Sequence, residues 1–172
     1  MIPDMKTAKT TARIVHPIEP TFDSNSAVLI LGSFPSKKSR EASYFYAHPQ
    51  NRFYKVLSGL FGEAEPKTTE ERKAFLLRHH IAVFDVIRSC IIEGSSDRSI
   101  RDVVPNDLSP ILQCAKIRAV FCNGRTAGTL YEKYLEPVTK IPCIVLPSTS
   151  PANASYSLSR LMSEWRSVRD LL

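Results

Sequence analysis

Short apolar runs that alternate with segments of helical periodicity limit the folds open to this chain more than any other feature. Continuous apolar runs predict four strands, at residues 27–31, 81–86, 117–122 and 141–146. Hydrophobic residues at helical spacing predict helices at residues 51–61, 69–79, 107–114, 125–135 and 156–171. Strands without polar alternation are typical of parallel sheets that helices cover on both faces. The order of elements therefore predicts an α/β fold with a mostly parallel sheet.

The length of the chain predicts one domain. Its 172 residues, 43% of them hydrophobic, suffice for one substantial core and leave little room for a second. Residues 1–26 include Pro3, Pro17 and Pro20 and show little periodicity. We expect them to form an extended lead-in that packs on a single domain at residues 27–172. Residues 12–16 are able to add an edge strand.

Charge and cysteine content narrow the class of protein. The chain has 23 Lys and Arg against 17 Asp and Glu, a net charge of +6 that allows a positive face but by itself decides nothing. Its four cysteines lie too far apart for a metal-binding pair, so we expect no metal and reduced, mostly buried thiols. No apolar run approaches the roughly 18 residues of a membrane span, and the N-terminus lacks a signal-peptide pattern. We expect a cytoplasmic protein. The cysteines are Cys90, Cys114, Cys122 and Cys143.

Residues suited to a binding site follow each predicted strand. Ligands of open α/β sheets bind in the crevice beyond the carboxyl ends of the strands, so residues at these ends are expected to lie close together. The four strand ends are Gly-Ser-Phe-Pro at 32–35, Phe84-Asp85, Asn123-Gly124, and Pro-Ser-Thr-Ser-Pro at 147–151.

Residues 29–54 carry chemistry that suits a flat, polyanionic ligand. After the first predicted strand come Lys37, Lys38, three aromatics at residues 44–46, His48 and Asn51. Lysines attract phosphates and aromatic rings stack on bases. Residues 148–153 follow another strand and offer hydroxyl and backbone N–H donors to phosphates. Two such segments in one crevice indicate a nucleic-acid enzyme.

Five segments together resemble the uracil-DNA glycosylase superfamily, and within it the branch of hypoxanthine-DNA (DNA-deoxyinosine) glycosylases. The resemblance covers about residues 26–172 in the right order. It implies a three-layer α/β/α fold around a four-stranded sheet and a monofunctional catalytic domain that cuts the N-glycosidic bond of a damaged base in DNA without a metal or other cofactor. The segments are GSFP at 32–35, YAHPQNRFY at 46–54, FD at 84–85, FCNG at 121–124 and LPSTSPAN at 146–153.

One departure separates this chain from a neighbouring branch. In similar mismatch-specific uracil glycosylases the first loop is Gly-x-Asn-Pro, whereas this chain has Phe34 in place of that asparagine. In the hypoxanthine branch the catalytic asparagine belongs to the AHPxN string, which implies Asn51 here. The departure favours hypoxanthine, and excision of uracil or thymine from mismatches remains the alternative.

The chemistry assigns roles to the residues of this resemblance. A base in a duplex must rotate into a pocket, and Tyr46 matches the position of the stacking ring in relatives. Asn51 is expected to hold the attacking water, and the same side chain could cap the next helix. Asp85 is expected to contact the base edge or to serve as general base, with a cap or ion pair as the alternative.

Further residues complete the expected site. His48 would neutralise the departing base or contact a phosphate, with a hydrogen bond to a nearby carbonyl as the alternative. Asn123 would contact the base or close the turn between strand and helix. Residues expected to bind the base also include Gly32, Ser33, Phe34 and Phe84. Residues expected to contact DNA are Ser36, Lys37, Lys38, Ser148, Thr149, Ser150, Pro151, Ala152 and Asn153.

Three other functions fit the sequence less well. A non-catalytic nucleic-acid-binding module would use the same aromatics and lysines, but would not need the amide, carboxylate and imidazole near one crevice. A strand-nicking lyase would need a desolvated lysine, for which Lys37 and Lys38 give no sign. A serine hydrolase of Ser33, His48 and Asp85 lacks the G-x-S-x-G turn. The expected partner is DNA with a damaged base, bound by a monomer.

Overall fold

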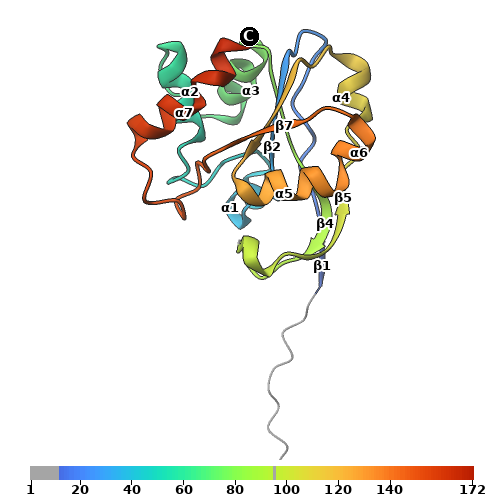
Figure 1. Cartoon of the computed structure of the whole chain (residues 1–172). Coiled ribbons are helices and arrows are strands. Elements are labelled where there is room, and N and C mark those ends of the chain that lie inside the picture. Colours follow the sequence, from blue (N-terminus) through green and yellow to red (C-terminus); the bar gives the residue numbers. More distant parts are fainter. Residues whose placement is uncertain (1–11, 95) are drawn as a thin grey trace, which may run out of the picture.

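The computed structural model describes residues 12–94 and 96–172 (Figure 1). Its centre is a four-stranded sheet in the order β3-β2-β6-β7, and every neighbouring pair in it is parallel. Helices cover both faces, with α2, α3 and α7 on one side and α4, α5 and α6 on the other. The predicted three-layer α/β/α fold is confirmed. The strands are β2 (Val28–Gly32), β3 (Ile81–Asp85), β6 (Ala119–Asn123) and β7 (Cys143–Leu146).

The burial of the strands follows their sequences. All five residues of β2 and of β3 are buried, as their uninterrupted apolar runs predict. The strand β7 forms one edge of the sheet, and its Ile144 and Val145 are exposed. The parallel arrangement brings the ends of all four strands to one edge, where the expected site residues lie.

The helices begin close to the expected positions. The predicted helix at 51–61 begins at Phe53, because the Asn51 side chain accepts a hydrogen bond from the Phe53 N–H before the first turn. Asp107 does the same for the Ser109 N–H ahead of the helix predicted at 107–114. Among the described helices, none combines the length and apolarity that a membrane span requires. The helices are α1 (Lys37–Ala42), α2 (Phe53–Phe61), α3 (Thr69–Arg78), α4 (Ser109–Cys114), α5 (Arg125–Tyr134), α6 (Glu136–Thr139) and α7 (Leu158–Asp170).

A second sheet, missing from the expectations, packs beside the first. The antiparallel strands β1 (Arg13–Val15), β4 (Ile87–Ile91) and β5 (Arg101–Pro105) form it in the order β1-β4-β5. Only Val86 separates β3 from β4, so no turn residues mark the change of sheet. The strand β5 was missed because its sequence, RDVVP, contains two charged residues and ends in proline. The short helices α1 and α6 were also missed, because each is too short to show periodicity.

The described part of the N-terminal segment packs on both sheets. The edge strand expected at residues 12–16 is confirmed as β1, which pairs with β4. Farther along, Thr21 forms an antiparallel bridge with Val83 and covers the outer edge of β3. Residues 1–11 lie outside the described residues. The division into a lead-in at 1–26 and a domain at 27–172 stays a prediction.

The cysteines are only partly as expected. All four are free thiols, and Cys90 and Cys122 are buried. Cys114 is exposed in the last turn of α4, and Cys143 is half-buried on the edge strand β7. The expectation of mostly buried thiols was therefore wrong for these two. Helix ends and sheet edges leave side chains open to water, which apolar neighbours in the sequence do not reveal.

The helix α3 provides a test of local stability. Thr68 accepts a hydrogen bond from the Glu71 N–H, and the Glu71 side chain bonds back to the Thr68 N–H, forming a capping box. Thr68→Ala should lower the free energy of unfolding by about 1 kcal/mol. Urea denaturation measures this. Thr69→Ala, one residue into the helix, is the matched control and should cause no loss, since alanine favours helix.

Candidate active site

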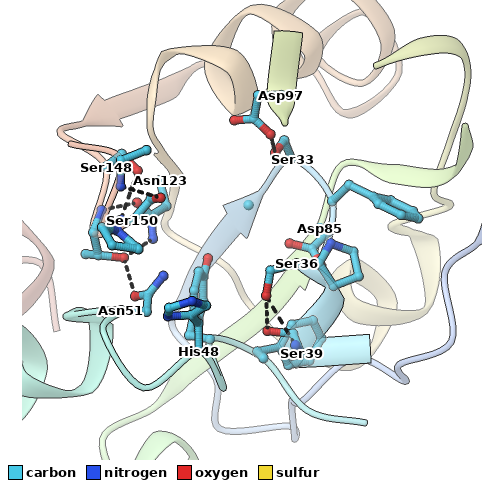
Figure 2. Close-up of a pocket in the computed structure, with 18 of the residues that line it drawn as sticks. Ser33, Ser36, Ser39, His48, Asn51, Asp85, Asp97, Asn123, Ser148 and Ser150 are labelled. Atoms are coloured by element: carbon cyan, nitrogen blue, oxygen red, sulfur yellow. Dashed lines mark hydrogen bonds between the residues drawn. The ribbon is translucent and has the colours of Figure 1, made fainter. Parts of the chain in front are cut away.

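A cavity of about 510 Å³ lies at the carboxyl ends of the strands, as expected. Its volume falls within the usual range for small-ligand pockets. Asn51 and Thr149, far apart in the sequence, line it together, so the predicted shared crevice is confirmed (Figure 2). The walls come from the segments after β2, before α2, between β4 and β5, and after β7. The lining residues are Gly32, Ser33, Phe34, Pro35, Ser36, Ser39, Phe45, Tyr46, His48, Asn51, Asp85, Ser96, Asp97, Arg98, Asn123, Ser148, Thr149, Ser150, Pro151 and Ala152.

The innermost corner of the cavity lies where β2 and β3 end side by side. Gly32 and Asp85 are paired in the parallel register of these strands. A Cβ on Gly32 would lie 2.4 Å from Asp85 Oδ1 and 3.1 Å from Tyr46 Oη. Any larger residue at position 32 would therefore displace the carboxylate. The two oxygens face the same corner.

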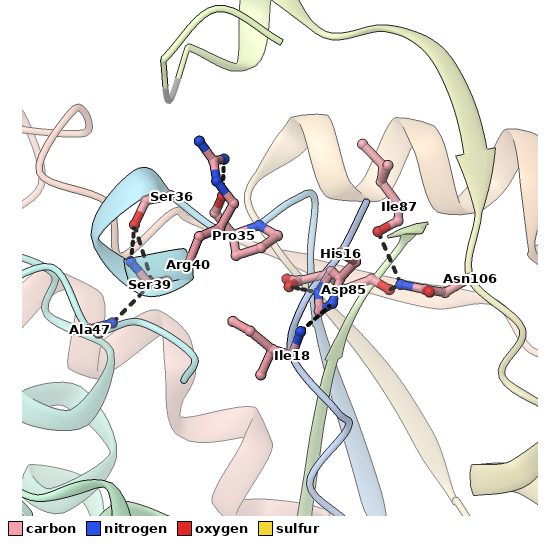
Figure 3. A network of polar contacts seen from close by, with 10 residues as sticks. All are labelled: His16, Ile18, Pro35, Ser36, Ser39, Arg40, Ala47, Asp85, Ile87 and Asn106. Carbon is pink, nitrogen blue, oxygen red and sulfur yellow. Dashed lines mark hydrogen bonds and ion pairs between the residues drawn. The ribbon is translucent and has the colours of Figure 1, made fainter. Parts of the chain in front are cut away.

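Asp85 is buried and has a partner that sequence reasoning missed. Its Oδ2 lies 2.7 Å from His16 Nε2, and both side chains are almost fully buried. Asn106, also buried, donates from Nδ2 to the carbonyl oxygens of Asp85 and Ile87 and holds the backbone here (Figure 3). Asp85 therefore has a polar partner, the kind of contact considered as its alternative role, and the carboxylate also lines the cavity.

Tyr46 lines the cavity in a strained backbone conformation. Its φ of 55° is in the left-handed region, which is uncommon outside glycine and often marks functional sites. Its ring stacks on Phe53 at 3.9 Å between centroids, so a fully buried ring supports it from the core. Its hydroxyl is buried without a hydrogen-bond partner among the described residues. Burial, and next the Asp85 charge, raise the pKa of Tyr46, which keeps the hydroxyl protonated.

A chain of hydrogen bonds joins Asn51, Thr149 and Asn123. Thr149 is fully buried, and its hydroxyl donates to Asn51 Oδ1 at 2.9 Å. The Asn123 Nδ2 donates to that hydroxyl at 2.9 Å, and Asn123 Oδ1 accepts from the Thr149 N–H at 3.0 Å. Both polar ends of Asn123 are therefore occupied, and its geometry supports the role in the strand-helix turn over contact with a base.

The loop after β7 is fixed to two helices. Arg52, at the start of α2, donates from its backbone N–H to the Thr149 carbonyl and from its guanidinium to the carbonyls of Asn153 and Tyr156. Trp165 of α7 is fully buried and donates from Nε1 to the Pro147 carbonyl at 2.9 Å. The AHPQNRF and LPSTSPAN segments noted in the sequence are thus joined into one unit.

The serines in these loops bond mainly to their own turns. The Ser36 hydroxyl accepts from the Ser39 N–H and caps α1. The Ser148 hydroxyl accepts from the Ser150 N–H, and the Ser150 hydroxyl accepts from the Ala152 N–H. Asn153 donates from Nδ2 to the Ser148 carbonyl. Their hydroxyls shape the loops, and contact with DNA remains a prediction.

The remaining expected residues lie in three places. His48 lines the cavity, where its Nδ1 accepts from the Gln50 N–H. Phe34 lines the cavity as well, whereas Phe84 lies behind it and contacts the His16 ring edge to face. Lys37 and Lys38 are exposed on α1, outside the cavity lining.

Asp97 is a second cavity residue that the sequence did not reveal. It lies in a short 3-10 helix between β4 and β5, and its Oδ1 accepts from the Ser33 hydroxyl at 3.1 Å. Desolvation is the main cause that raises the pKa of the Asp97 carboxyl. The hydrogen bond from Ser33 lowers this pKa, and the nearby Asp85 charge raises it further. No sequence pattern marks a connection between two strands that were themselves missed. Among the described residues, no three His, Cys, Asp or Glu side chains form a metal site.

Comparison with known proteins decides the family. The family model of the uracil DNA glycosylase superfamily matches residues 19–172. The chain belongs to the uracil DNA glycosylase superfamily. Two relatives of this chain are named hypoxanthine DNA glycosylase. One, from Methanosarcina acetivorans, is 38% identical over 151 residues, which is 85% of this chain and 92% of the relative. The other, from Methanosarcina barkeri, is 33% identical over 148 residues with the same coverage.

A solved structure agrees with this placement in the superfamily. The solution NMR structure of a proposed uracil DNA glycosylase from Methanosarcina acetivorans superposes with a TM-score of 0.77 at 34% identity. It covers 92% of this chain and 99% of the solved one. His16, the partner of Asp85, precedes the residues that the superfamily model matches.

The buried hydroxyl of Thr149 can be tested by substitution. Thr149→Val keeps the shape of the side chain but removes both the donor to Asn51 and the acceptor for Asn123. The free energy of unfolding should fall by about 1–3 kcal/mol, because buried amide groups lose partners. Thr149→Ser keeps the hydroxyl and should retain most of the stability. Urea denaturation of both variants separates the hydroxyl from the methyl group, and equal losses would contradict the assignment.

Proposed function

We propose that this protein is a monofunctional DNA glycosylase that hydrolyses the N-glycosidic bond of deaminated bases, chiefly hypoxanthine, at the start of base excision repair. The observation that carries the proposal is the amide of Asn51, held by Thr149 in a cavity at the carboxyl edge of the sheet. The two Methanosarcina relatives named hypoxanthine DNA glycosylase support the choice of base.

The orientation of the Asn51 amide supports its catalytic role. Its Oδ1 accepts from the Phe53 N–H at 3.0 Å and from the Thr149 hydroxyl at 2.9 Å. A backbone N–H is only a donor, so the atom that it contacts must be the oxygen. The nitrogen then lies on the side away from the Thr149 loop (Figure 2). The N–H of Asn51 Nδ2 therefore donates to the oxygen of the attacking water. The second lone pair of that water stays free for the attack.

A weak nucleophile suffices for this reaction. Glycosidic cleavage of a deoxynucleotide passes through a state with positive charge on the sugar, so stabilising that charge and the departing base matters more than activating the water. The Asp85 carboxylate lines the same cavity, where it can contact the edge of the base. His48 accepts at Nδ1, so in the neutral ring Nε2 carries the hydrogen and can donate to the departing base.

The surroundings of the cavity suit DNA. Pro151 and Ala152 lie at the tip of the loop that Arg52 fixes, where a stiff wedge can fill the space of an extruded nucleotide. Lys38 on the nearby α1 is exposed and contacts a phosphate without regard to sequence. The protein acts as a monomer in the cytoplasm, and its four free thiols suit a reducing compartment.

The activity is tested with a duplex that contains one deoxyinosine. The wild-type protein should leave an abasic site that alkali converts into a strand break. Asn51→Ala should lower kcat by about 10²- to 10³-fold while binding survives, as for the loss of one preorganised donor. Cleavage is measured by gel electrophoresis under single-turnover conditions, and binding by fluorescence anisotropy.

Thr69→Ala, remote from the cavity, is the control for purification and handling. Salt-sensitive binding without any product would favour the non-catalytic binding module, and a preference for uracil or thymine duplexes would favour the mismatch enzyme. Full activity of Asn51→Ala would move catalysis to another residue, with Asp85 the next to test.

The proposed phosphate contact makes a separate prediction. Lys38→Gln should weaken DNA binding and lower the slope of log Kd against log salt by about one unit, with little change in kcat. Lys73→Gln on α3 also removes an exposed lysine and should leave the slope unchanged. Anisotropy titrations at several salt concentrations measure both. Equal slopes in the two variants would remove Lys38 from the interface.

A further inference from the structure

The imidazole of His16 is buried in an apolar setting at the back of the cavity. Its side chain is 2% exposed, and the rings of Phe34, Phe45 and Phe84 surround it at centroid distances of 5.2 to 6.1 Å. A polar ring in such surroundings is costly unless both nitrogens have partners. The partners of those nitrogens fix what His16 can do.

The hydrogen bonds define the tautomer of the neutral ring. His16 Nδ1 lies 3.2 Å from the Ile18 N–H, which is only a donor, so Nδ1 is the acceptor (Figure 3). The hydrogen of the ring is then on Nε2, which donates to Asp85 Oδ2 at 2.7 Å. In either charge state of the ring, Nε2 presents a hydrogen to Asp85. Asp85 Oδ2 is therefore occupied.

The second oxygen of Asp85 remains for a ligand. Within residues 12–94 and 96–172, Asp85 Oδ1 has no hydrogen-bond partner, and Asp85 lines the cavity. Oδ1 lies close to Gly32, and the buried, unpartnered hydroxyl of Tyr46 lies close to the same glycine. A fixed acceptor thus lies next to a hydroxyl donor at the end of the cavity.

We propose that His16 is a positioning residue for base recognition, which holds Asp85 so that Oδ1 accepts the ring N–H that deamination creates. This inference rests on the proposed glycosylase function and concerns the residues that determine its specificity for the base. Deamination of adenine replaces the amino group by a carbonyl and places a hydrogen on the adjacent ring nitrogen. Hypoxanthine then offers N–H to Asp85 and its carbonyl to the Tyr46 hydroxyl.

The same geometry rejects adenine, the base from which hypoxanthine forms. Adenine presents a bare ring nitrogen to Asp85 Oδ1, so two lone pairs face each other, and its amino group faces the Tyr46 hydroxyl. Sites built around a hydrogen bond discriminate strongly against a ligand that lacks it, because their buried polar groups are left unpaired. Because adenine is abundant in DNA, the enzyme must not accept it. His16 contributes to this discrimination by preventing Asp85 from turning Oδ1 away.

The test measures discrimination separately from chemistry. Fluorine at the sugar 2′ position slows glycosidic cleavage, so duplexes with 2′-fluoro-2′-deoxyinosine or 2′-fluoro-2′-deoxyadenosine report binding by anisotropy. The ratio of their Kd values is compared for the wild type, His16→Leu, His16→Gln and Asp85→Asn. The KM and kcat for a deoxyinosine duplex are measured in parallel.

His16→Leu and Asp85→Asn should lower the ratio at least about tenfold and raise KM more than they lower kcat. His16→Gln keeps an N–H donor near Asp85 Oδ2 and should restore the ratio to within about threefold of the wild type. The matched control is His79→Leu, since His79 bonds Glu63 at the same distance, 2.7 Å, away from the cavity. It should leave the ratio unchanged.

The outcomes distinguish this inference from the proposed function. A wild-type protein that leaves deoxyinosine intact overturns the function itself. A wild type that cleaves deoxyinosine, with a normal ratio in His16→Leu or an equal loss in His16→Gln, overturns only the role of His16. If His16→Leu fails to fold, Asp85→Asn decides, and an unchanged ratio in that variant sinks the proposal.

Discussion

The hydroxyl of Thr149 is the contact on which the rest of the site depends. It is fully buried, accepts from Asn123 and donates to Asn51, so it joins the ends of β6 and β7 to the start of α2. Because Arg52 bonds to the same loop, the segment before α2 and the segment after β7 form one unit. In the proposed mechanism this amide needs no rearrangement when a nucleotide enters, and such preorganisation is a main source of catalytic power in enzymes.

The sequence predicted the central sheet and most of the cavity for a simple physical reason. Continuous apolar runs identify buried parallel strands, and parallel strands bring their carboxyl ends to one edge. The sequence alone thus predicts that Gly32, Asp85 and Asn123 share one crevice, as they do. The strings around Asn51 and Thr149 added the resemblance to a family that the comparison confirms.

The missing residues depend on contacts that no local pattern encodes. His16 meets Asp85 across 69 positions, from a proline-containing segment without periodicity. Asp97 reaches the cavity from a connection between β4 and β5, and β4 follows β3 without a turn. The loop serines show how one residue type can serve two purposes. Their residue type suits phosphate binding, yet the same hydroxyls cap α1 and hold the turns after β7, because serine bonds readily to nearby backbone.

The bridge between Thr21 and Val83 gives the segment before residue 26 a double importance. An open strand edge invites pairing with other chains, and proteins often cover such an edge with a loop. Here the segment that shields the β3 edge also supplies the imidazole behind the cavity. Cover of the β3 edge and the position of the Asp85 side chain thus depend on the same short stretch of chain, so a deletion there would affect both.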